Sequence, residues 1–483
     1  MVIASFLFFL LCFMGIGILS ALKSKGNNHD YLLAGSNIKP WLAALSAIAT
    51  SCSGYMFIGM IGYTYLYGIS SMWIMLGFIV GDFVSSGFAF RRIREATEER
   101  KVMSFGGVIS RWQKGTDFTK LRKLVGVITL IFLGTYAAAQ FAAGSKALHI
   151  LFGWDYKIGA ILGAIMVFLY CTAGGIRASI WTDAAQSFVM IISMTILCFT
   201  SIYVLGGLEA TWVQMKMIGP NFVSLMPKHT ALAGPAGWIL FIAGWFIAGF
   251  GVIGQPHIMV RFMMVDDPKN MNKVRLYYYL WYSAFSAITI MVGLLTRLLL
   301  PEVGSFDSEL ALPLLANQLL PSILIGVVLA GLFAATMSTA DSQILSCCAA
   351  ITRDLFPNKK EKIIVTKLTT LGVTATALTI ALFGTQSVYD LICMSWSTLG
   401  CCFGPLIVLY CMKKRVTERV AIFMVIFAFI TALSFRYFGL HNHINEIAPG
   451  VAMGFVVYSV GTMMENTTIP LRKLLIWITN NFK

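Results

Sequence analysis

Long apolar stretches separated by short polar loops run through the whole chain. About thirteen of them are long enough to cross a bilayer, whose hydrocarbon core of about 30 Å needs roughly 20 residues of helix. Because these runs are continuous and do not alternate over about ten residues, they indicate helices and not barrel strands. The pattern predicts an all-α integral membrane protein whose helices lie at 3–22, 41–67, 71–90, 124–150, 157–176, 180–207, 236–256, 276–300, 321–351, 362–383, 388–411, 419–438 and 447–466.

The composition agrees with a chain that uses the bilayer as its solvent. Hydrophobic residues make up 58% and charged residues 12% of the sequence, whereas soluble domains carry about 25% charged residues. The longest polar stretches, 91–123 and 208–235, run to roughly 30 residues and are too short for a separate domain. We expect one membrane domain over 1–483.

The distribution of positive charge predicts how the chain crosses the membrane. The net charge is +15, and about 29 of the 36 Lys and Arg residues fall in alternate loops, which the positive-inside rule assigns to the cytoplasm. The loop 91–123 holds ten of them, and the loop 62–71 holds none. We therefore expect a multi-pass protein of the plasma or inner membrane, with its N-terminus outside and its C-terminus cytoplasmic. Nucleic acid is not an expected partner, because the charge follows the topology.

Oxygen-bearing side chains cluster in the apolar stretch 321–351, between Thr336 and Gln343. Hydroxyls and carboxylates in hydrocarbon are costly unless they have partners, so they usually face a protein-lined path for an ion or a solute. The chain contains no GxSxG, HExxH or P-loop motif that would indicate hydrolysis or direct use of ATP. The sequence therefore favours a transporter and not an enzyme.

Two apolar stretches contain residues that interrupt helices, at 49–54 (ATSCSG) and at 249–256 (GFGVIGQP). Discontinuous helices in transporters leave carbonyls and helix ends free to bind ions and solutes, although Gly and Ser in membrane helices also serve close packing. Each interrupted helix would open a half of five helices. The pattern predicts an inverted repeat over 41–207 and 236–411, preceded by an extra helix at 3–22 and followed by helices over 419–466.

Several short motifs occur in an order that resembles the sodium:solute symporter family, and its sodium/proline-symporter-like branch in particular. The resemblance implies a LeuT-type core of two inverted five-helix repeats. The motifs are DYLLAG at 30–35, SG at 53–54, WTD at 181–183, GQPH at 254–257 with RF at 261–262, MSTADS at 337–342 and FGP at 403–405.

The resemblance also implies a sodium site between the second and ninth helices. Its hydroxyl ligands would come from Ser338 and Thr339, and its backbone carbonyls from Ala49, Cys52 and Ala335. A small hard cation takes about five or six oxygens, and neutral ligands hold it weakly enough for release. The alternative is that these hydroxyls only bond to carbonyls of their own helix.

Acidic residues mark a possible second cation site. Asp183 matches an acidic position that the family uses near the cytoplasmic ion exit, and Asp341 and Ser342 share the helical face of Ser338. Two acids in the membrane need a cation, a proton or a basic partner. We expect either a second cation site or a hydrogen-bonded gate here. Asp82, a third acid in an apolar stretch, matches no motif.

The resemblance places the solute pocket at the two interruptions. The expected lining residues are Ser51, Ser53, Gly54, Tyr136, Ala248, Gly251, Val252, Gln255 and Trp396. The proline branch usually carries an aspartate at the position of Ser51 and an aromatic pair at those of Ala248 and Val252. These departures weaken the assignment of proline and open space for another amino acid or a carboxylate.

Taken with the resemblance, the sequence predicts sodium-driven symport of a small organic solute, an amino acid such as proline or a carboxylate, into the cytoplasm by alternating access. Proton coupling on the same fold and a solute sensor that does not transport are the alternatives. Sodium is the only expected metal and acts as coupling ion, with no cofactor. The expected partners are the solute, sodium and the bilayer, without an obligate protein partner.

Overall fold

The computed structural model describes residues 1–481 apart from 229, 231, 233, 358–361, 385–387 and 443, and it leaves out the side chains of 150, 389, 442 and 466–481. Within these residues the regular structure is helical, as the hydrophobic pattern predicts, and eleven helical segments are long and apolar enough to span a membrane. The longer helices are α1 (Val2–Ser20), α3 (Pro40–Tyr55), α5 (Met72–Arg100), α7 (Thr119–Phe152), α8 (Tyr156–Val204), α10 (Pro235–Phe250), α12 (Met271–Leu299), α14 (Ser322–Ala349), α15 (Ile363–Phe383), α16 (Val388–Cys411), α17 (Glu418–Tyr437) and α18 (Ile447–Asn481).

Shorter helices cap and connect these spans. They are α2 (Asn28–Leu33), α4 (Ile61–Tyr67), α6 (Phe105–Arg111), α9 (Leu208–Ile218), α11 (Pro256–Met263) and α13 (Ala311–Leu319).

Eleven segments accommodate the thirteen predicted crossings because two segments each contain two of them. The segment Pro40–Arg100 joins the predicted helices 41–67 and 71–90, and Gly68 turns the chain between them with φ 72°. Helix α8 joins 157–176 and 180–207, with a kink at Gly175, where φ is 58°. Both glycines adopt backbone conformations that other residues rarely take. The two numbers therefore differ only because a helical segment that continues through a turn or a kink is counted once.

Two helices run beyond their predicted ends. Helix α5 continues ten residues past 90 to Arg100, where ion pairs spaced by four residues join Arg91 to Glu95 and Arg94 to Glu98. Such pairs support a helix in water, so the apolar pattern marks the membrane boundary and not the end of the helix. Helix α18 likewise continues from its apolar part to Asn481.

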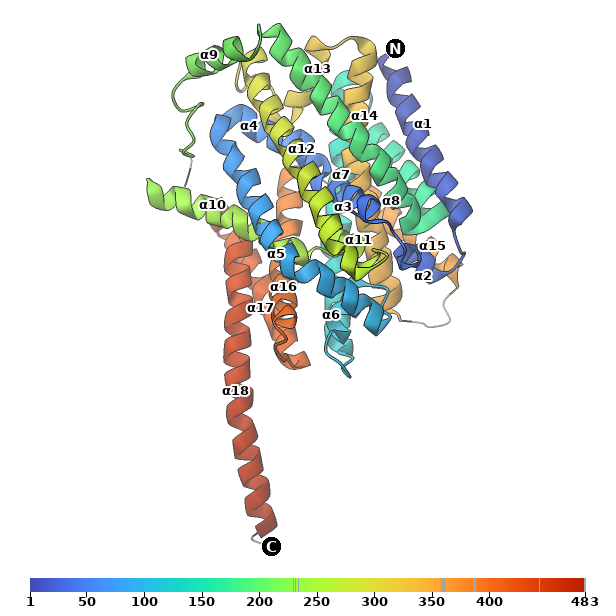
Figure 1. Ribbon diagram of the computed structural model, residues 1–483, viewed down its shortest axis with the longest axis vertical. Coiled ribbons are helices and arrows are strands. Elements are labelled where there is room, and N and C mark those ends of the chain that lie inside the picture. Colours follow the sequence, from blue (N-terminus) through green and yellow to red (C-terminus); the bar gives the residue numbers. More distant parts are fainter. Residues whose placement is uncertain are drawn as a thin grey trace.

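Helix α14 lies at the centre of the bundle. In the most apolar stretch of 18 residues in α14, 89% is buried inside the protein, against 17% in the corresponding stretch of α18. It packs against α8, α7, α3 and α1, while α17 packs against α18 and α16. Figure 1 shows the N-terminus of α1 near α13 at one end of the molecule and the C-terminal end of α18 at the other. The polar side chains of α14 are thereby enclosed by protein.

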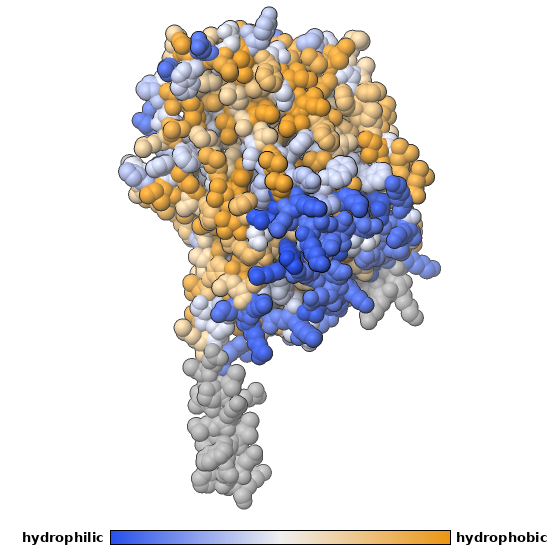
Figure 2. Space-filling model, in the orientation of Figure 1, coloured by the Kyte–Doolittle hydropathy of each residue, from blue (hydrophilic) through white to orange (hydrophobic). Residues whose placement is uncertain are grey.

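Hydrophilic residues gather at one end of the molecule. Figure 2 shows an apolar surface over most of the visible face and a hydrophilic region at the end that contains α2, α6 and α11. The exposed basic residues Arg91, Arg92 and Lys101 belong to the charged end of α5 in the same part of the chain. An apolar belt above a charged face is the surface expected of a membrane protein.

Helices α5 and α10 approach each other so closely that glycine is required at the contact. A Cβ atom built on Gly249 would lie 1.9 Å from the carbonyl oxygen of Phe78, and one on Gly81 would lie 1.9 Å from that of Phe246. These neighbours are backbone atoms and cannot rotate away. The contact fixes α10 beside the part of α5 that carries Phe78.

We expect Gly249→Ala to lower the thermal unfolding midpoint in detergent clearly, because overpacking typically costs about 1–3 kcal/mol. The matched control is Gly372→Ala on α15, where an added Cβ meets nothing within 4 Å. Equal unfolding midpoints for the two variants would contradict the packing described here.

Candidate functional site

The first predicted interruption is a true break in the helix. Within α3, Ser53 adopts φ 47° and ψ −178°, and a π-helical segment, Met56–Met60, follows before α4. A positive φ is unusual for serine and is kept only where the surroundings hold it. Side chains satisfy the backbone after the break, since the amide of Gly54 donates to Gln140 Oε1 at 3.0 Å and that of Tyr55 to Ser53 Oγ at 3.1 Å.

The second predicted interruption is also confirmed. Helix α10 ends at Phe250, a 3-10 turn covers Gly251–Gly254, and Gln255 is extended before α11 begins at Pro256. Pro256 has no amide to donate, which suits the first turn of a helix. The Gln255 side chain donates from Nε2 to the carbonyl oxygen of Trp396 at 2.8 Å and ties the break to α16.

Four of the five residues predicted for sodium lie together between α3 and α14. Ser338 Oγ lies 3.0 Å from the carbonyl oxygen of Ala49 and 3.1 Å from that of Ala335. Thr339 Oγ1 also donates to Ala335, at 3.1 Å. These hydroxyls bond both within their own helix and across to α3, so the purely local alternative does not describe them.

The carbonyl of Cys52, the fifth predicted ligand, accepts the amide of Met56, and no hydroxyl of this cluster donates to it within the described residues. Its neighbour Thr50 takes part instead, because its carbonyl oxygen accepts from Thr339 Oγ1 at 2.9 Å and its Oγ1 lies 2.9 Å from Ser342 Oγ. The break at Ser53 follows these carbonyls by only a few residues, so it ends the helix beside the cluster.

The two predicted acids share a basic partner. Arg261 on α11 lies with Nη2 3.1 Å from Asp183 Oδ2 and 3.7 Å from Asp341 Oδ1, and all three side chains are fully buried. The same nitrogen donates to Ser179 Oγ at 2.6 Å and to Ser342 Oγ. Two acids in the membrane need a cation, a proton or a basic partner, and in this structure Arg261 is the basic partner.

Hydroxyl groups complete this acid cluster. Ser46 donates to Asp183 Oδ2 at 2.6 Å. Tyr170 donates to Asp341 Oδ2 at 2.8 Å, and Ser179 donates to Asp341 Oδ1 at the same distance. Asp183 Oδ1 and the Nε and Nη1 atoms of Arg261 make no hydrogen bond within the described residues. If both acids are ionised, their charge of −2 against +1 on the arginine leaves −1 to be neutralised.

A pocket opens beside the break in α3. Five of the predicted solute residues line it, and the rest of the lining comes from α3, α5, α10, α12, α16 and the segment before α18. The cavity is small, since the volume open to the centre of a water molecule is about 50 Å³. Its lining residues are Ser51, Ser53, Tyr55, Met56, Ile74, Met75, Phe78, Tyr136, Trp245, Ala248, Tyr282, Ile392, Cys393, Trp396, Ser397 and Asn445.

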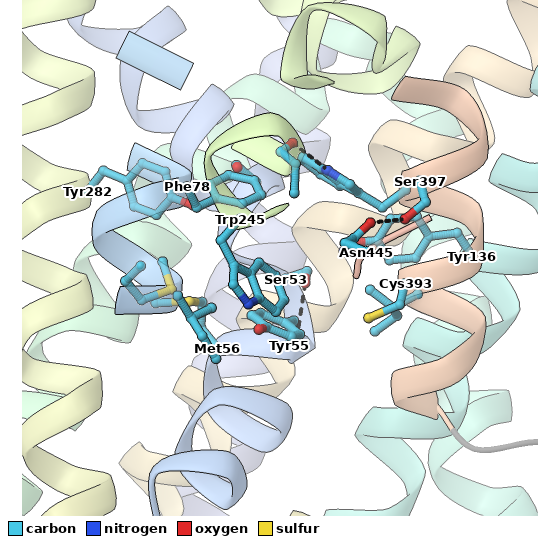
Figure 3. Close-up of a pocket in the computed structure, with 16 residues that line it drawn as sticks. Ser53, Tyr55, Met56, Phe78, Tyr136, Trp245, Tyr282, Cys393, Ser397 and Asn445 are labelled. Carbon is cyan, nitrogen blue, oxygen red and sulfur yellow. Dashed lines mark hydrogen bonds between the residues drawn. The ribbon is translucent and has the colours of Figure 1, made fainter. Parts of the chain in front are cut away.

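The lining is aromatic and carries no ionised side chain among the described residues. In Figure 3, Tyr282 and Phe78 lie on one side and Tyr136, Cys393, Ser397 and Asn445 on the other. The indole of Trp396 donates to the carbonyl oxygen of Ala248 at 3.1 Å. Ala248 lines the pocket without a ring and Val252 does not line it, so the rings of the pocket wall come from other positions.

Four predicted solute residues lie outside the pocket lining. Gly54 packs against Thr336 and Gln140, and Gly251 packs so closely on Ile447 that an added Cβ would lie 2.4 Å from its Cδ1 atom. Gln255 bonds to the backbone of α16, and Val252 is fully buried. These residues shape the breaks around the pocket without facing it.

Residues 31–427 match the sequence profile of the sodium:solute symporter family. The chain belongs to this family. The resemblance seen in the motifs is therefore confirmed, and the chain is a sodium-driven solute symporter and not an enzyme. Sodium is the coupling ion that the family uses.

Proline transporters are among the relatives of this symporter. It is 28% identical to the high-affinity proline transporter PutP of Bacillus subtilis over 89% of this chain and 92% of the relative. It is 28% identical to the sodium/proline symporter of Escherichia coli, over 91% and 89%. The likeness extends over nearly the full length of both relatives.

Solved structures confirm the LeuT-type fold of the symporter. A Na⁺-coupled sialic acid symporter in a substrate-bound outward-open state superposes with a TM-score of 0.80 at 17% identity and covers 95% of this chain and 97% of that one. Mhp1, a nucleobase-cation-symport-1 family transporter, gives a TM-score of 0.56 at 14% identity, with coverage of 90% and 95%.

Sequence reasoning missed two parts of the symporter's site. Arg261 belongs to the RF motif at 261–262 that indicated the family. Its pairing with the two acids, however, depends on where α11 lies against α8 and α14 after the break. Asn445 lines the pocket from beyond the expected repeats and bonds to Ser397 at 3.1 Å. A single asparagine in a loop gives no periodic signal that could have indicated this contact.

Proposed function

We propose that this symporter imports a compact amino acid without net charge, such as proline, together with sodium. The observation that carries the proposal is the pocket lining, which combines aromatic rings and hydroxyls with no ionised side chain among the described residues. A pyrrolidine or small aliphatic body suits such rings. An anionic solute would need a cationic partner there, so a carboxylate without a compensating amine fits less well. The proline transporters among the relatives support the same class.

Sodium would bind between α3 and α14, at Ser338, Thr339 and the carbonyls of Ala49 and Ala335. Their mutual distances of 3.0–3.1 Å support one shared site, because small outward shifts of these oxygens would surround a cation. Cys52 is expected to contribute a fifth oxygen, and its carbonyl, which accepts the amide of Met56, keeps a second lone pair for an ion. The carbonyl of Thr50, bonded to Thr339, is a further candidate.

We assign the acid cluster of Asp183, Asp341 and Ser342 to a gate that Arg261 closes. With both acids ionised, the cluster would carry −2 when the arginine moves away and would then attract a second cation. Replacing Asp183 by Asn would then alter the dependence of uptake on sodium.

The proposed ion site and the solute pocket would be coupled through the few residues of α3 that separate them. Thr50 contacts the residues of the ion site, and Ser53 lines the solute pocket three residues later. Sodium that holds these carbonyls in place would fix the break that shapes the pocket. Ion and solute would then increase each other's affinity equally, by about 1–3 kcal/mol in a typical case.

The repeat boundaries at 41–207 and 236–411 and the orientation in the membrane belong to the same proposal. The two breaks open the two halves at corresponding places, which supports the repeats. The termini lie at opposite ends, and the C-terminal end of α18 shares its side with the hydrophilic face. This supports a cytoplasmic C-terminus and an external N-terminus.

A thermal-stability screen of the purified protein tests the solute. Proline in sodium buffer is expected to raise the unfolding midpoint, because a ligand at 100 times its Kd stabilises the folded state by about 2.7 kcal/mol. The same additions in potassium buffer should have a much smaller effect. Sialic acid and sugars serve as comparisons. Stabilisation by one of these and not by proline or another small amino acid would contradict the proposed solute class.

A further inference from the structure

Asp82 is an acid in the middle of α5 that the sodium and solute sites do not use. Its side chain is fully buried. Neither carboxylate oxygen makes a hydrogen bond of normal geometry, and no ion pair to it occurs within the described residues. The hydroxyls of Tyr278 and Tyr279 reach it only through weak hydrogen bonds, and a buried ionised carboxylate that is so poorly paired is strongly disfavoured. Its charge must therefore be neutralised by something that binds to it.

The basic residue that acts on Asp82 is held elsewhere. Arg275 on α12 donates to Ser86 Oγ and to the carbonyl oxygen of Phe83, each at 3.0 Å, and its guanidinium lies 4.7 Å from the Phe83 ring centre. Tyr279 donates to the same serine oxygen at 2.8 Å. Arg275 thus acts on Asp82 only through space.

The titratable groups that face Asp82 all come from α12. They are Tyr278, Tyr279, Tyr282 and Arg275, and within the described residues α10 and α11 add no further titratable group to its surroundings.

Two further hydroxyls lead from Asp82 to the solute pocket. The hydroxyl of Tyr278 and that of Ser51 are buried and, like Asp82, make no hydrogen bond of normal geometry. The Ser51 hydroxyl lies within weak hydrogen-bonding reach of the Tyr278 and Tyr282 hydroxyls, and Tyr282 lines the pocket with Ser51. Phe78, one helical turn before Asp82, lines it too. Asp82 therefore lies one layer of side chains behind the pocket wall.

We propose that Asp82 is a proton-binding site that exchanges its proton with the solute pocket through Tyr278 and Ser51. A proton from pocket water rests on a carboxylate oxygen and returns by the same route, and no other bond changes. A sodium ion needs about five or six oxygens, whereas the rings of Phe78, Tyr278 and Tyr282 pack against one another beside this part of α5. A single proton, in contrast, neutralises the carboxylate without any further ligand.

The inference rests on the solute pocket proposed above and adds a dependence on pH to it. A solute in the pocket displaces water near Ser51, which favours the neutral acid behind it. Solute and proton then strengthen each other's binding. Solute affinity is expected to fall as the pH rises, approaching about tenfold for each pH unit over the range in which the acid ionises.

Infrared spectroscopy of the purified protein tests the proton site without any solute. Other buried acids, among them Asp183, Asp341 and Asp354, are common to the wild type and Asp82→Asn, so the difference spectrum between these two proteins at neutral pH should contain the carbonyl stretch of the protonated Asp82 alone. The control is Asp117→Asn, at a half-exposed acid paired with Arg111 and Arg122. A difference spectrum without this band, or one that Asp117→Asn reproduces, overturns the proposal.

The affinity for proline, measured over a range of pH, tests the link to the pocket. The wild type should lose affinity at alkaline pH, and Asp82→Asn, which mimics the neutral acid, should not. Identical pH profiles, or a loss of sodium dependence in the variant, overturn the proton assignment. If proline binds neither protein, the solute assignment fails and the infrared result alone decides the proton site.

Discussion

Arg261→Gln should lower stability more than any other single change proposed for this symporter. The variant leaves the fully buried carboxylates of Asp183 and Asp341 without their cation. Removal of one partner from a buried ion pair typically costs about 3–5 kcal/mol. The measurement is the unfolding midpoint in detergent in sodium and in potassium. Arg91→Gln is the matched control, because Arg91 pairs with Glu95 at the exposed end of α5 and such pairs contribute about 0–1 kcal/mol.

A second substitution shows whether charge is the cause. In Arg261→Gln with Asp341→Asn the cluster carries the same −1 as the native cluster, so the double variant should be more stable than Arg261→Gln alone. Neighbours that share one network are expected to deviate from additivity by about 0.5–3 kcal/mol. Strictly additive losses would mean that Arg261 acts mainly through packing.

Thr339→Val should weaken sodium binding by about 10–100-fold. Valine keeps the branched shape but removes an oxygen, and a hydrogen bond to a charged group contributes about 1.5–3 kcal/mol. The matched control is Thr336→Val one turn earlier, because Thr336 Oγ1 donates only to its own helix at Phe333. Sodium affinity can be read from the sodium dependence of the unfolding midpoint.

The comparison in potassium separates ion binding from packing. Thr339 also bonds α14 to α3 through Thr50, so Thr339→Val is expected to lose some stability in both buffers. Only the sodium-dependent part reports on the ion site. If Thr339→Val and Thr336→Val have equal sodium affinities, Thr339 is not a ligand.

The sequence predicted what depends on local chemistry. The membrane spans follow from runs of apolar residues, and both helix breaks follow from Gly, Ser and Pro, whose effects on the backbone are local. The charged end of α5 beyond 90 was not predicted, because a helix in water is stabilised by ion pairs and not by apolar length. The cluster of Ala49, Ala335, Ser338 and Thr339 came from the family motifs.

Contacts between distant segments could not be predicted in the same way. The partner of Asp183 is Arg261, 78 residues away on a short helix that exists only because the chain breaks before it. The pocket rings of Phe78, Trp245 and Tyr282 stand at positions that packing also explains. Their shared orientation towards one cavity depends on the close approach of α5 and α10, which requires glycines on both.

The proposed ion site and the proposed solute pocket are built from largely different helices. The ion cluster belongs to α3 and the buried centre of α14, whereas most of the pocket wall comes from α5, α10, α12, α16 and Asn445. Substitutions in the wall can therefore accumulate without disturbing the oxygens that would hold sodium. An ancestral transporter of this design could change its cargo repeatedly while it kept the same energy source, and Asn445, outside both repeats, would be among the positions freest to vary.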